Sequence, residues 1–364
     1  MAPVNPAIPY ASLRAAASGL GDWLAAGALP VWSSLGVDPA NGGFREALTV
    51  EGGRRDPRRR ARVQARQAFV FATAAARGGP WLATARRGLE QFLAAGRRPD
   101  GLFVHTLSPA GEVTDPAARL YEHAFILLAL SALGDAKGAT ELRDRLSAFR
   151  HPAGGFRETD DQPFQANAQM HLFEAALAWE GQGGDAGWAG LADELAVLAL
   201  DRLIDPVTGA VHEAFDAAWR PLRGEADAVE PGHQFEWAWL LDRWGAARGE
   251  ARAHTAARRL YDAGRRGFDR TRGVVINRLW DDLSVRDAAA RLWPQTEFLK
   301  AALALGEDAD ALMAANAVGR FLDTPLRGVW RERMSADGAF VEEPAPATSL
   351  YHLATAIWAL AARA

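Results

Sequence analysis

GGFRE occurs at residues 42–46 and again at residues 154–158, and four other stretches of the chain follow the same pattern. They are GLFVH (101–105), GAVHE (209–213), GVVIN (273–277) and GVWRE (328–332). Each copy begins with a glycine that can turn the chain, and it continues with aromatic or β-branched residues. Each copy therefore predicts a small β-hairpin, and the copies together indicate six structural repeats.

Two stretches with apolar residues at helical spacing separate successive hairpins. The first pair is QAFVFATAAA (67–76) and WLATARRGLEQFLAA (81–95). The same spacing predicts helices at 10–29, 58–77, 80–96, 116–134, 136–149, 163–182, 185–203, 230–248, 250–266, 287–305, 307–323 and 345–363.

A helical hairpin cannot bury its apolar face alone, so six of them must stack in a row or close into a ring. The first helix (10–29) and the last (345–363) both lack a partner in their own hairpin, so they can pair and close the ring. The last helix, SLYHLATAIWALAA (349–362), is too apolar for the polar cap of an open stack. We therefore predict an all-α (α/α)6 barrel, with short β-hairpins at its mouth, as one domain spanning residues 1–364.

Composition excludes several classes of protein. The 41 Lys and Arg residues stand against 45 Asp and Glu, a net charge of −4, so a nucleic-acid partner is not expected. The absence of cysteine excludes disulfides, thiolate nucleophiles and Cys-ligated zinc. The N-terminus shows no secretory signal and no apolar run reaches the roughly 20 residues of a membrane span. We expect a cytoplasmic protein with no membrane partner, either a monomer or a homodimer.

Polar residues interrupt the apolar pattern near the start of each helix that follows a hairpin. They are Gln64, Arg66, Glu122, His123, Asn167, His171, His233, Glu236, Trp293, Gln295, Glu297 and His352. Six equivalent helix starts in a closed ring point to one mouth, so these side chains should line a common polar cavity. A single such histidine is more often a hydrogen-bonded core residue, but burying this many polar groups is costly unless they are paired or hydrated.

Spacing indicates which of these groups act together. Asn167 and His171 are four residues apart and share a helix face, as do His233 and Glu236 at three apart. A carboxylate one turn from an imidazole can fix its tautomer and raise its basicity. His105 and His212 are weaker candidates for the mouth. No metal-ligand helix motif of the HExxH type and no nucleotide-binding glycine motif is present.

One strongly basic stretch, RRDPRRRAR (54–62), precedes a predicted helix. It is either a solvated, salt-bridged helix start or a site for an anionic ligand such as a sugar phosphate. The second interpretation is open because cations at a helix N-terminus oppose the helix dipole, and a bound anion would remove that cost.

Six ordered motifs resemble the N-acylglucosamine 2-epimerase superfamily, which includes mannose isomerases and sugar 2-epimerases. The motifs are RVQARQAF (62–69), YEHAFILLAL (121–130), NAQMHLFEAALA (167–178), EPGHQFEWAWLL (230–241), LWPQTEFLKAAL (292–303) and SLYHLATAI (349–357). The resemblance covers nearly the entire chain, and it implies the same (α/α)6 fold.

The resemblance also implies roles for individual residues. His233 and His352 correspond to the two acid/base histidines. Arg66, Asn167, His171 and Glu236 correspond to groups that bind or orient the sugar, and Trp293 and Gln295 to the wall of the site. Such an enzyme removes the proton on C2 of an open-chain aldose and stabilises the resulting enediolate, for which Arg66 is the expected partner. We expect no metal and no cofactor.

The first interpretation is an isomerase that converts a mannose-like aldose to a fructose-like ketose. The alternatives are a mannose 6-phosphate isomerase that uses the arginines of residues 54–62, and a 2-epimerase of the N-acylglucosamine or mannose type. A glycoside hydrolase using two of the glutamates 122, 236 and 297 belongs to another class, and so does a sugar-binding protein without catalysis.

Overall fold

A computed structural model of the chain describes residues 9–158, 163–224 and 228–364. In these ranges α1 (Leu13–Asp22), the π-helix η1 (Trp23–Ala28) and α2 (Leu29–Ser34) follow one another without a break. If these three are counted as one helix, the described residues form twelve helices. The predicted number of helices is confirmed, and so are their positions except at some ends: residues 287–291, predicted as helix, belong to strand β8 (Val285–Arg291), and the first helix continues to Ser34.

The helix that directly follows a hairpin signature is called here the leading helix of its repeat. The leading helices are α3 (Ala61–Ala76), α5 (Leu120–Leu133), α7 (Ala166–Gly181), α9 (Pro231–Arg248), α11 (Leu292–Ala304) and α13 (Ser349–Arg363). The second helices are α4 (Leu82–Gly96), α6 (Ala136–Arg145) with η2 (Leu146–Phe149), α8 (Ala186–Leu198) with η3 (Ala199–Leu203), α10 (Ala251–Arg265) and α12 (Asp308–Phe321).

Leading and second helices differ in how they are buried. Almost every residue of α5 from Leu120 to Ser131 is buried, which matches its nearly continuous apolar sequence. By contrast, α10 buries one stripe at helical spacing and exposes its other face. The leading helices therefore contribute most of the core, and each second helix covers one side of it.

No helix of the described residues combines the length and the apolar character that a bilayer span requires.

Each hairpin signature turns at its glycine, as predicted. The first glycine of all six copies has a positive φ, between 65° and 105°, a conformation that only glycine adopts without strain. In five copies an antiparallel bridge or strand pair joins the third signature residue to a residue one to three positions after the end of the preceding helix. The pairs are Val37 with Phe44, Arg97 with Phe103, Arg150 with Phe156, Ile204 with Val211, and Phe268 with Val275.

A buried side chain of the leading helix clamps the hairpin in the same five repeats. In four of them this side chain is a glutamine. Its amide oxygen accepts from the backbone N–H of the third signature residue, and its amide nitrogen donates to the backbone C=O of the same residue. These pairs are Gln64 with Phe44, Gln169 with Phe156, Gln234 with Val211 and Gln295 with Val275, at 2.7 to 3.1 Å. In the second repeat His123 Nε2 accepts from Phe103 N at 3.0 Å.

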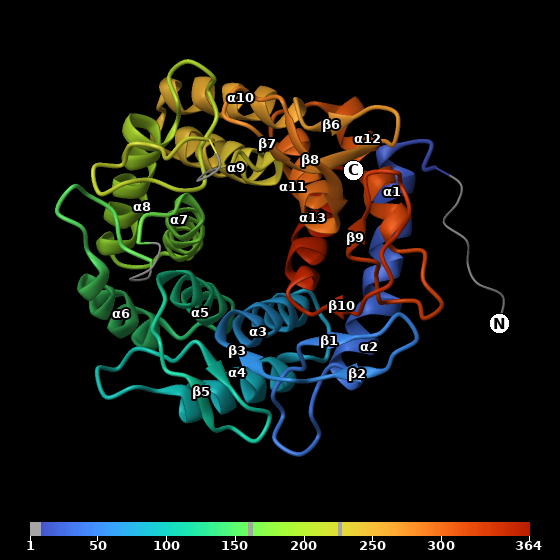
Figure 1. The fold of residues 1–364 in the computed structure, drawn as a ribbon. Helices are drawn as coiled ribbons and strands as arrows, with labels where there is room; N and C mark the ends of the chain where they lie inside the picture. Colours follow the sequence, from blue (N-terminus) through green and yellow to red (C-terminus); the bar gives the residue numbers. More distant parts are fainter. Residues whose placement is uncertain (1–8, 159–162, 225–227) are drawn as a thin grey trace. The chain divides into compact units, whose positions relative to one another are not determined.

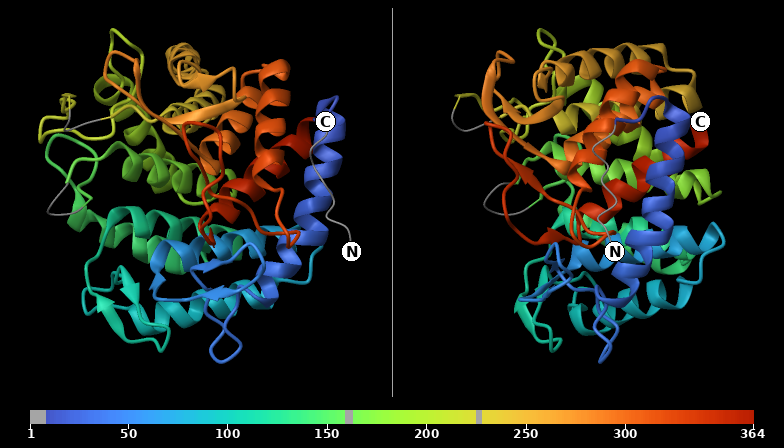
Figure 2. Two further views of the ribbon diagram at one scale, coloured as in Figure 1. Left: turned by 45° about the vertical axis from the view of Figure 1, so that its right-hand side comes forward. Right: turned by 90° about the vertical axis from the view of Figure 1, so that its right-hand side faces the viewer.

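The strands are short except for one ribbon. They are β1 (Ala47–Leu48), β2 (Arg54–Arg55), β3 (Arg59–Arg60), β4 (Thr106–Leu107), β5 (Val113–Asp115), β6 (Phe268–Asp269), β7 (Val274–Leu279), β8 (Val285–Arg291), β9 (Arg333–Met334) and β10 (Ala345–Pro346). Strands β3, β4 and β5 form one antiparallel sheet, and β6, β7, β8 and β9 form another. The ribbon of β7 and β8 leads directly into α11 (Figure 2).

The chain divides into two compact units. Unit 1 comprises residues 1–30, 196–345 and 352–364, and unit 2 comprises residues 31–195 and 346–351. Within unit 2, α3 packs against α4 and α5, and α5 packs against α7 (Figure 1). Within unit 1, α9 packs against α10 and α11, while α12 packs against α11 and α1. The expected single domain, and the pairing of the first helix with the last, stay predictions.

Candidate active site

The leading helices begin without a side-chain cap of their own. The N-cap residues of α3, α5, α7, α9 and α11 make no capping hydrogen bond. Carboxylates from other segments satisfy several of these N–H groups instead: Glu46 accepts from Arg60 N at 2.7 Å, Glu158 from Tyr121 N at 2.8 Å and Glu213 from Glu230 N at 3.4 Å. The glutamates that end three hairpin signatures thus lie at the starts of the leading helices, where the helix dipole favours negative charge.

His233, on the first turn of α9, lies among carboxylates of unit 1. Its Nδ1 is 2.8 Å from Glu213 Oε2 and 3.9 Å from Glu230 Oε2. Burial alone would lower the pKa of His233, but Glu213, Glu230 and Glu236 outweigh it and raise that pKa to about 9. His233 is therefore an imidazolium at neutral pH. Glu213, not the expected Glu236, holds the ring.

Trp293 of α11 contacts both candidate histidines. Its ring centroid is 4.9 Å from that of His233 and 5.7 Å from that of His352. The expected wall residue therefore lies beside both imidazoles, all three within unit 1.

His352, on α13, is held by a second carboxylate. Its Nδ1 is 2.8 Å from Glu297 Oε1, and Glu297 Oε2 contacts Lys300 Nζ at 2.8 Å and accepts from Trp239 Nε1 at 3.1 Å. Burial opposes ionisation of Glu297, but Lys300 and His352 together lower its pKa to about 2. Glu297 is thus a permanent anion that orients the His352 ring.

Glu236, Glu297 and His352 bring potential metal-ligand atoms within 4.8 Å of one another. All three residues are buried, and Glu236 is fully so. The Lys300 ammonium already supplies a positive charge to this cluster. This ammonium, 2.8 Å from Glu297, repels a further cation at the cluster.

Arg66 of α3 is buried in unit 2 among aromatic rings. Its guanidinium carbon lies 3.9 Å from the Phe125 ring centroid and 5.2 Å from that of Tyr351. It donates to Tyr121 Oη at 2.9 Å and to the hydroxyl of Thr348. Its buried Nε has no hydrogen-bond partner among the described residues. The guanidinium of Arg66 is therefore incompletely hydrogen-bonded, and its expected role in binding the sugar stays a prediction.

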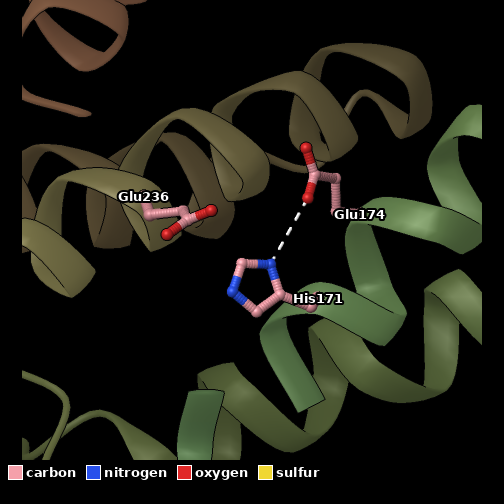
Figure 3. Close-up of side chains that lie close together, drawn as sticks. All are labelled: His171, Glu174 and Glu236. Atoms are coloured by element: carbon pink, nitrogen blue, oxygen red, sulfur yellow. Dashed lines mark hydrogen bonds and ion pairs between the residues drawn. The ribbon is translucent and has the colours of Figure 1, made fainter. Parts of the chain in front are cut away.

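His171 and Glu174 lie on one face of α7, also in unit 2. His171 Nδ1 is 3.4 Å from Glu174 Oε2 (Figure 3), and Glu174 Oε1 accepts from Tyr351 Oη. The His171 ring also packs on Phe125, with centroids 4.4 Å apart. The partner of His171 within its helix is thus Glu174, although Asn167 was expected to act with it.

Asn167 lines a cavity of about 1010 Å³ within unit 2. Its buried Oδ1 has no hydrogen-bond partner in the part of the chain that the structure describes. The sugar-binding role expected for Asn167 stays a prediction.

Gln295 has a structural role instead of the expected role in the wall. It is fully buried, its Oε1 accepts from Val275 N at 2.7 Å, and its Nε2 donates to the carbonyls of Val275 and Arg291 at 2.8 Å. Both ends of the amide are therefore used to hold β7 on α11. Gln64 and His123 have the same structural role in their repeats.

The basic stretch at residues 54–62 is largely a set of structural ion pairs. Arg59 is 1% exposed and bonds to Asp38 at 2.6 Å and Asp56 at 3.0 Å. Arg60 pairs with Glu46 at 2.6 Å, and Arg62 pairs with Glu122. The interpretation as a salt-bridged helix start is confirmed for these three arginines.

Sequence reasoning did not predict which carboxylates orient the histidines. Glu213 ends the fourth hairpin signature, and the repeated final glutamate of that signature was the signal that could have revealed it. Glu297 and Glu174 lie on the same helices as expected site residues, but a single sequence does not show which carboxylate faces which ring.

These features define an all-α protein of paired helices, with two carboxylate-held histidines beside one tryptophan. The family model of N-acylglucosamine 2-epimerase (GlcNAc 2-epimerase) matches residues 42–356. The chain belongs to the N-acylglucosamine 2-epimerase family, so it is an enzyme of the carbohydrate isomerase and epimerase class, and its substrate is a sugar.

Individual relatives agree with this assignment. A mannose-6-phosphate isomerase of Rhizobium meliloti (strain 1021) is 45% identical over 94% of this chain and 95% of its own. A D-mannose isomerase of Thermobifida fusca is 30% identical over 56% of this chain and 58% of its own.

Solved structures show the fold. The cellobiose 2-epimerase of Spirochaeta thermophila superposes with a TM-score of 0.84 at 22% identity, covering 96% of this chain and 97% of its own. A D-mannose isomerase gives a TM-score of 0.81 at 20% identity, covering 96% of both chains. The fold is the predicted (α/α)6 class.

Proposed function

We propose that the chain is an aldose–ketose isomerase of mannose-type hexoses in which His233 and His352 carry the proton transfers. The observation that supports this most directly is the pair of imidazoles, each within 2.8 Å of a carboxylate through Nδ1 and both in contact with Trp293. Because Nδ1 is held in both rings, we assign Nε2 of each to proton transfer. The names of the two relatives, both isomerases of mannose or its phosphate, support the same choice.

The two histidines take different roles in this proposal. His233 is charged near neutral pH and acts as the acid, donating a proton to the carbonyl oxygen of the open-chain sugar. His352 acts as the base that removes the proton from C2 and returns it to C1. When His352 returns the proton to C1, the now neutral His233 takes up the proton of the O2 hydroxyl, which completes the change from aldose to ketose and restores both histidines.

The remaining site residues bind or orient the sugar. We assign Arg66 to the developing enediolate oxygen, on the basis of the family resemblance and its unsatisfied Nε. Asn167, His171 and Glu236 are proposed to bind or orient the sugar, and Trp293 to form the wall against which it packs. Monomeric or homodimeric assembly and a cytoplasmic location stay predictions.

Proton transfer between carbons of a sugar does not by itself require a metal. We therefore expect turnover to survive prolonged dialysis against EDTA. Loss of activity that added divalent cation restores would contradict this expectation and would assign Glu236, Glu297 and His352 to a metal.

Two of the three glutamates considered for a glycoside hydrolase are poor proton donors. A hydrolase needs one carboxylic acid that is protonated near neutral pH. The pKa values of Glu122 and Glu297 are lowered to about 2: burial opposes this shift, but Arg62 and His105 outweigh it at Glu122, and Lys300 and His352 at Glu297. Neither Glu122 nor Glu297 can donate a proton to a leaving group at neutral pH, which weighs against these two residues as the acid of a hydrolase.

Turnover in heavy water followed by NMR separates isomerisation from 2-epimerisation. With mannose and mannose 6-phosphate as substrates, we expect a ketose product that carries deuterium at C1. Deuterium at C2 of an epimeric aldose, without ketose, would replace the proposal by a 2-epimerase. Release of reducing ends from oligosaccharides, unaffected by His233→Ala, would replace it by a hydrolase.

A further inference from the structure

Glu230, the residue directly before α9, is buried and pairs with two arginines of the β7–β8 ribbon, all within unit 1. Its Oε1 accepts from Arg278 Nε at 3.2 Å, and its Oε2 accepts from Arg291 Nη2 at 2.9 Å. The side chain of Arg278 is 48% exposed, whereas that of Arg291 is 27% exposed. The ion pair of Glu230 with Arg291 is therefore the shorter one and the less screened by solvent.

The same carboxylate lies beside His233. Glu230 Oε2, the oxygen that Arg291 binds, is 3.9 Å from His233 Nδ1. The backbone carbonyl of Glu230 also accepts from His233 N at 3.1 Å, in the first turn of α9. Arg291 and His233 thus share one carboxylate oxygen, and a change at Arg291 reaches His233 through it.

A second contact joins Arg291 to Trp293. The guanidinium carbon of Arg291 lies 5.3 Å from the centroid of the Trp293 ring, which is a cation–π distance. The same ring lies against Gly232 of α9, where a Cβ atom would come within 2.4 Å of Trp293 Cζ3. The ring that contacts both candidate histidines is therefore positioned by Arg291 and by the space that Gly232 leaves for it.

The orientation of Arg291 is fixed by the ribbon. Its Nε donates to Asn277 Oδ1 at 3.1 Å, and Asn277 Nδ2 donates to Asp287 Oδ2 at 3.0 Å. The backbone carbonyl of Arg291 accepts from the clamp residue Gln295 at 2.8 Å, at the point where β8 ends and α11 begins. Both the side chain and the backbone of Arg291 are thus held before any ligand binds.

We propose that Arg291 is a positioning residue of the site, which holds the Glu230 carboxylate beside His233 and the Trp293 ring beside both histidines. A guanidinium suits this role because its planar fork can bond to a carboxylate while it packs on an aromatic ring. The assignment rests on the proposed function for the roles of His233 and His352. It gives the β7–β8 ribbon, whose strands are the longest among the described residues, a function in the site.

The charges around His233 give this proposal a measurable consequence. Burial lowers the pKa of His233, but the neighbouring carboxylates outweigh it and raise that pKa to about 9. A positive charge near the ring disfavours the imidazolium, so the arginines that pair with Glu230 offset part of its effect. The charged groups that contact the ring or this carboxylate are Glu213 of the fourth hairpin signature, Glu230 and Glu236 at α9, Arg278 of β7 and Arg291 at the start of α11.

The test compares the pH dependence of kcat/KM on mannose and mannose 6-phosphate. We expect the alkaline limb of Arg291→Gln to move to higher pH by at least about 0.5 pH unit, because the charge of Glu230 is then less offset. The limb of Glu230→Gln should move to lower pH. Arg14→Gln, which removes an exposed arginine from α1 in the same unit, is the control and should keep the wild-type limb.

Arg291→Lys separates charge from geometry. Lysine keeps the positive charge but lacks the planar fork that bonds Glu230 and Asn277 together, so we expect a limb near the wild-type position. We expect its KM to rise, because the Trp293 ring loses the guanidinium that packs on it.

NMR titration of ¹³C-labelled histidine follows the His233 ring without turnover, and the His233→Ala spectrum assigns its resonance. We expect the titration midpoint to rise in Arg291→Gln and to fall in Glu230→Gln. An unmoved midpoint in Arg291→Gln, or in Glu230→Gln if the arginine variant does not fold, would overturn the proposal and leave the isomerase function standing. Opposite shifts in a protein that turns over neither sugar would support the positioning role while refuting the proposed function.

Discussion

His233 and His352 differ in the charges that surround their rings. His233 contacts two carboxylates, Glu213 and Glu230, and its pKa is raised to about 9. The carboxylate that contacts His352, Glu297, shares its charge with Lys300. The two histidines, on α9 and α13, thus have different surroundings, as the assignment of one acid and one base requires.

Replacing either histidine tests whether the two act on one carbon. We expect His233→Ala and His352→Ala each to lower kcat by about 10² to 10⁴, and the double variant to be little worse than the poorer single variant. Steady-state kinetics on mannose and mannose 6-phosphate measures this. Circular dichroism should show folded variants. A His352→Ala enzyme with wild-type turnover would remove His352 from the mechanism.

Glu213 sets the pH range in which His233 is charged. The folded pKa of His233 lies above its ordinary value, so the ring is protonated at neutral pH and loses its proton as pH rises through about 9. We expect Glu213→Gln to lower that pKa and to move the alkaline limb of the kcat/KM profile to lower pH. An unmoved limb with reduced kcat would show that Glu213 only supports the fold.

At the scale of elements, the buried glutamine clamps fix where each leading helix starts relative to its hairpin. Arg66 and His171 lie two residues after a clamp, His233 lies one residue before and Trp293 lies two before. The clamp therefore sets the positions of these side chains, near the start of the helix, relative to the hairpin. Because the amide satisfies a backbone N–H and a C=O at once, no apolar residue can replace it without leaving both groups buried and unpaired.

Gln295→Leu separates the clamp from a role in sugar binding. We expect the substitution to lower the free energy of unfolding by about 1–3 kcal/mol, because the N–H and C=O of buried Val275 lose their partner. Urea unfolding measures the change, and Gln182→Leu, at an exposed position after α7, is the control. A higher KM with unchanged stability would instead restore Gln295 to the wall of the site.

At the scale of the whole molecule, buried carboxylates should make the fold sensitive to acid. Burial raises the pKa of Glu122, but Arg62 and His105 outweigh it and hold the value at about 2, below the ordinary 4.5. Its folded pKa is lowered, so its contribution is complete above about pH 4.5 and is lost as pH falls towards 2. That contribution is about 3 kcal/mol.

Urea unfolding at pH 7, 4 and 3 tests this linkage. We expect Glu122→Gln to be less stable than wild type at pH 7 but to lose less additional stability on acidification. Glu90→Gln, which removes an exposed carboxyl from α4, serves as the control. Parallel pH dependence in wild type and Glu122→Gln would contradict the assigned pKa.

The sequence alone determined the repeat, and with it the fold class and the helix positions. Six glycines with positive φ, six hairpin signatures and twelve apolar periodicities are local features, and local steric and hydrophobic rules suffice to interpret them. The candidate histidines were also visible, because an imidazole within an apolar helix stands out.

Only the tertiary structure decided which side chains form hydrogen bonds and ion pairs with one another. Glu213 reaches His233 across 20 residues, and Glu297 reaches His352 across 55. Gln295 is a clamp because its partner is the backbone of β7. Arg119 and Asn167 line one cavity although α6 and the third hairpin signature separate them in the chain. Hydrogen bonds and ion pairs depend on distances of about 3 Å between specific atoms, and sequence spacing gives those distances only within a single helix or turn.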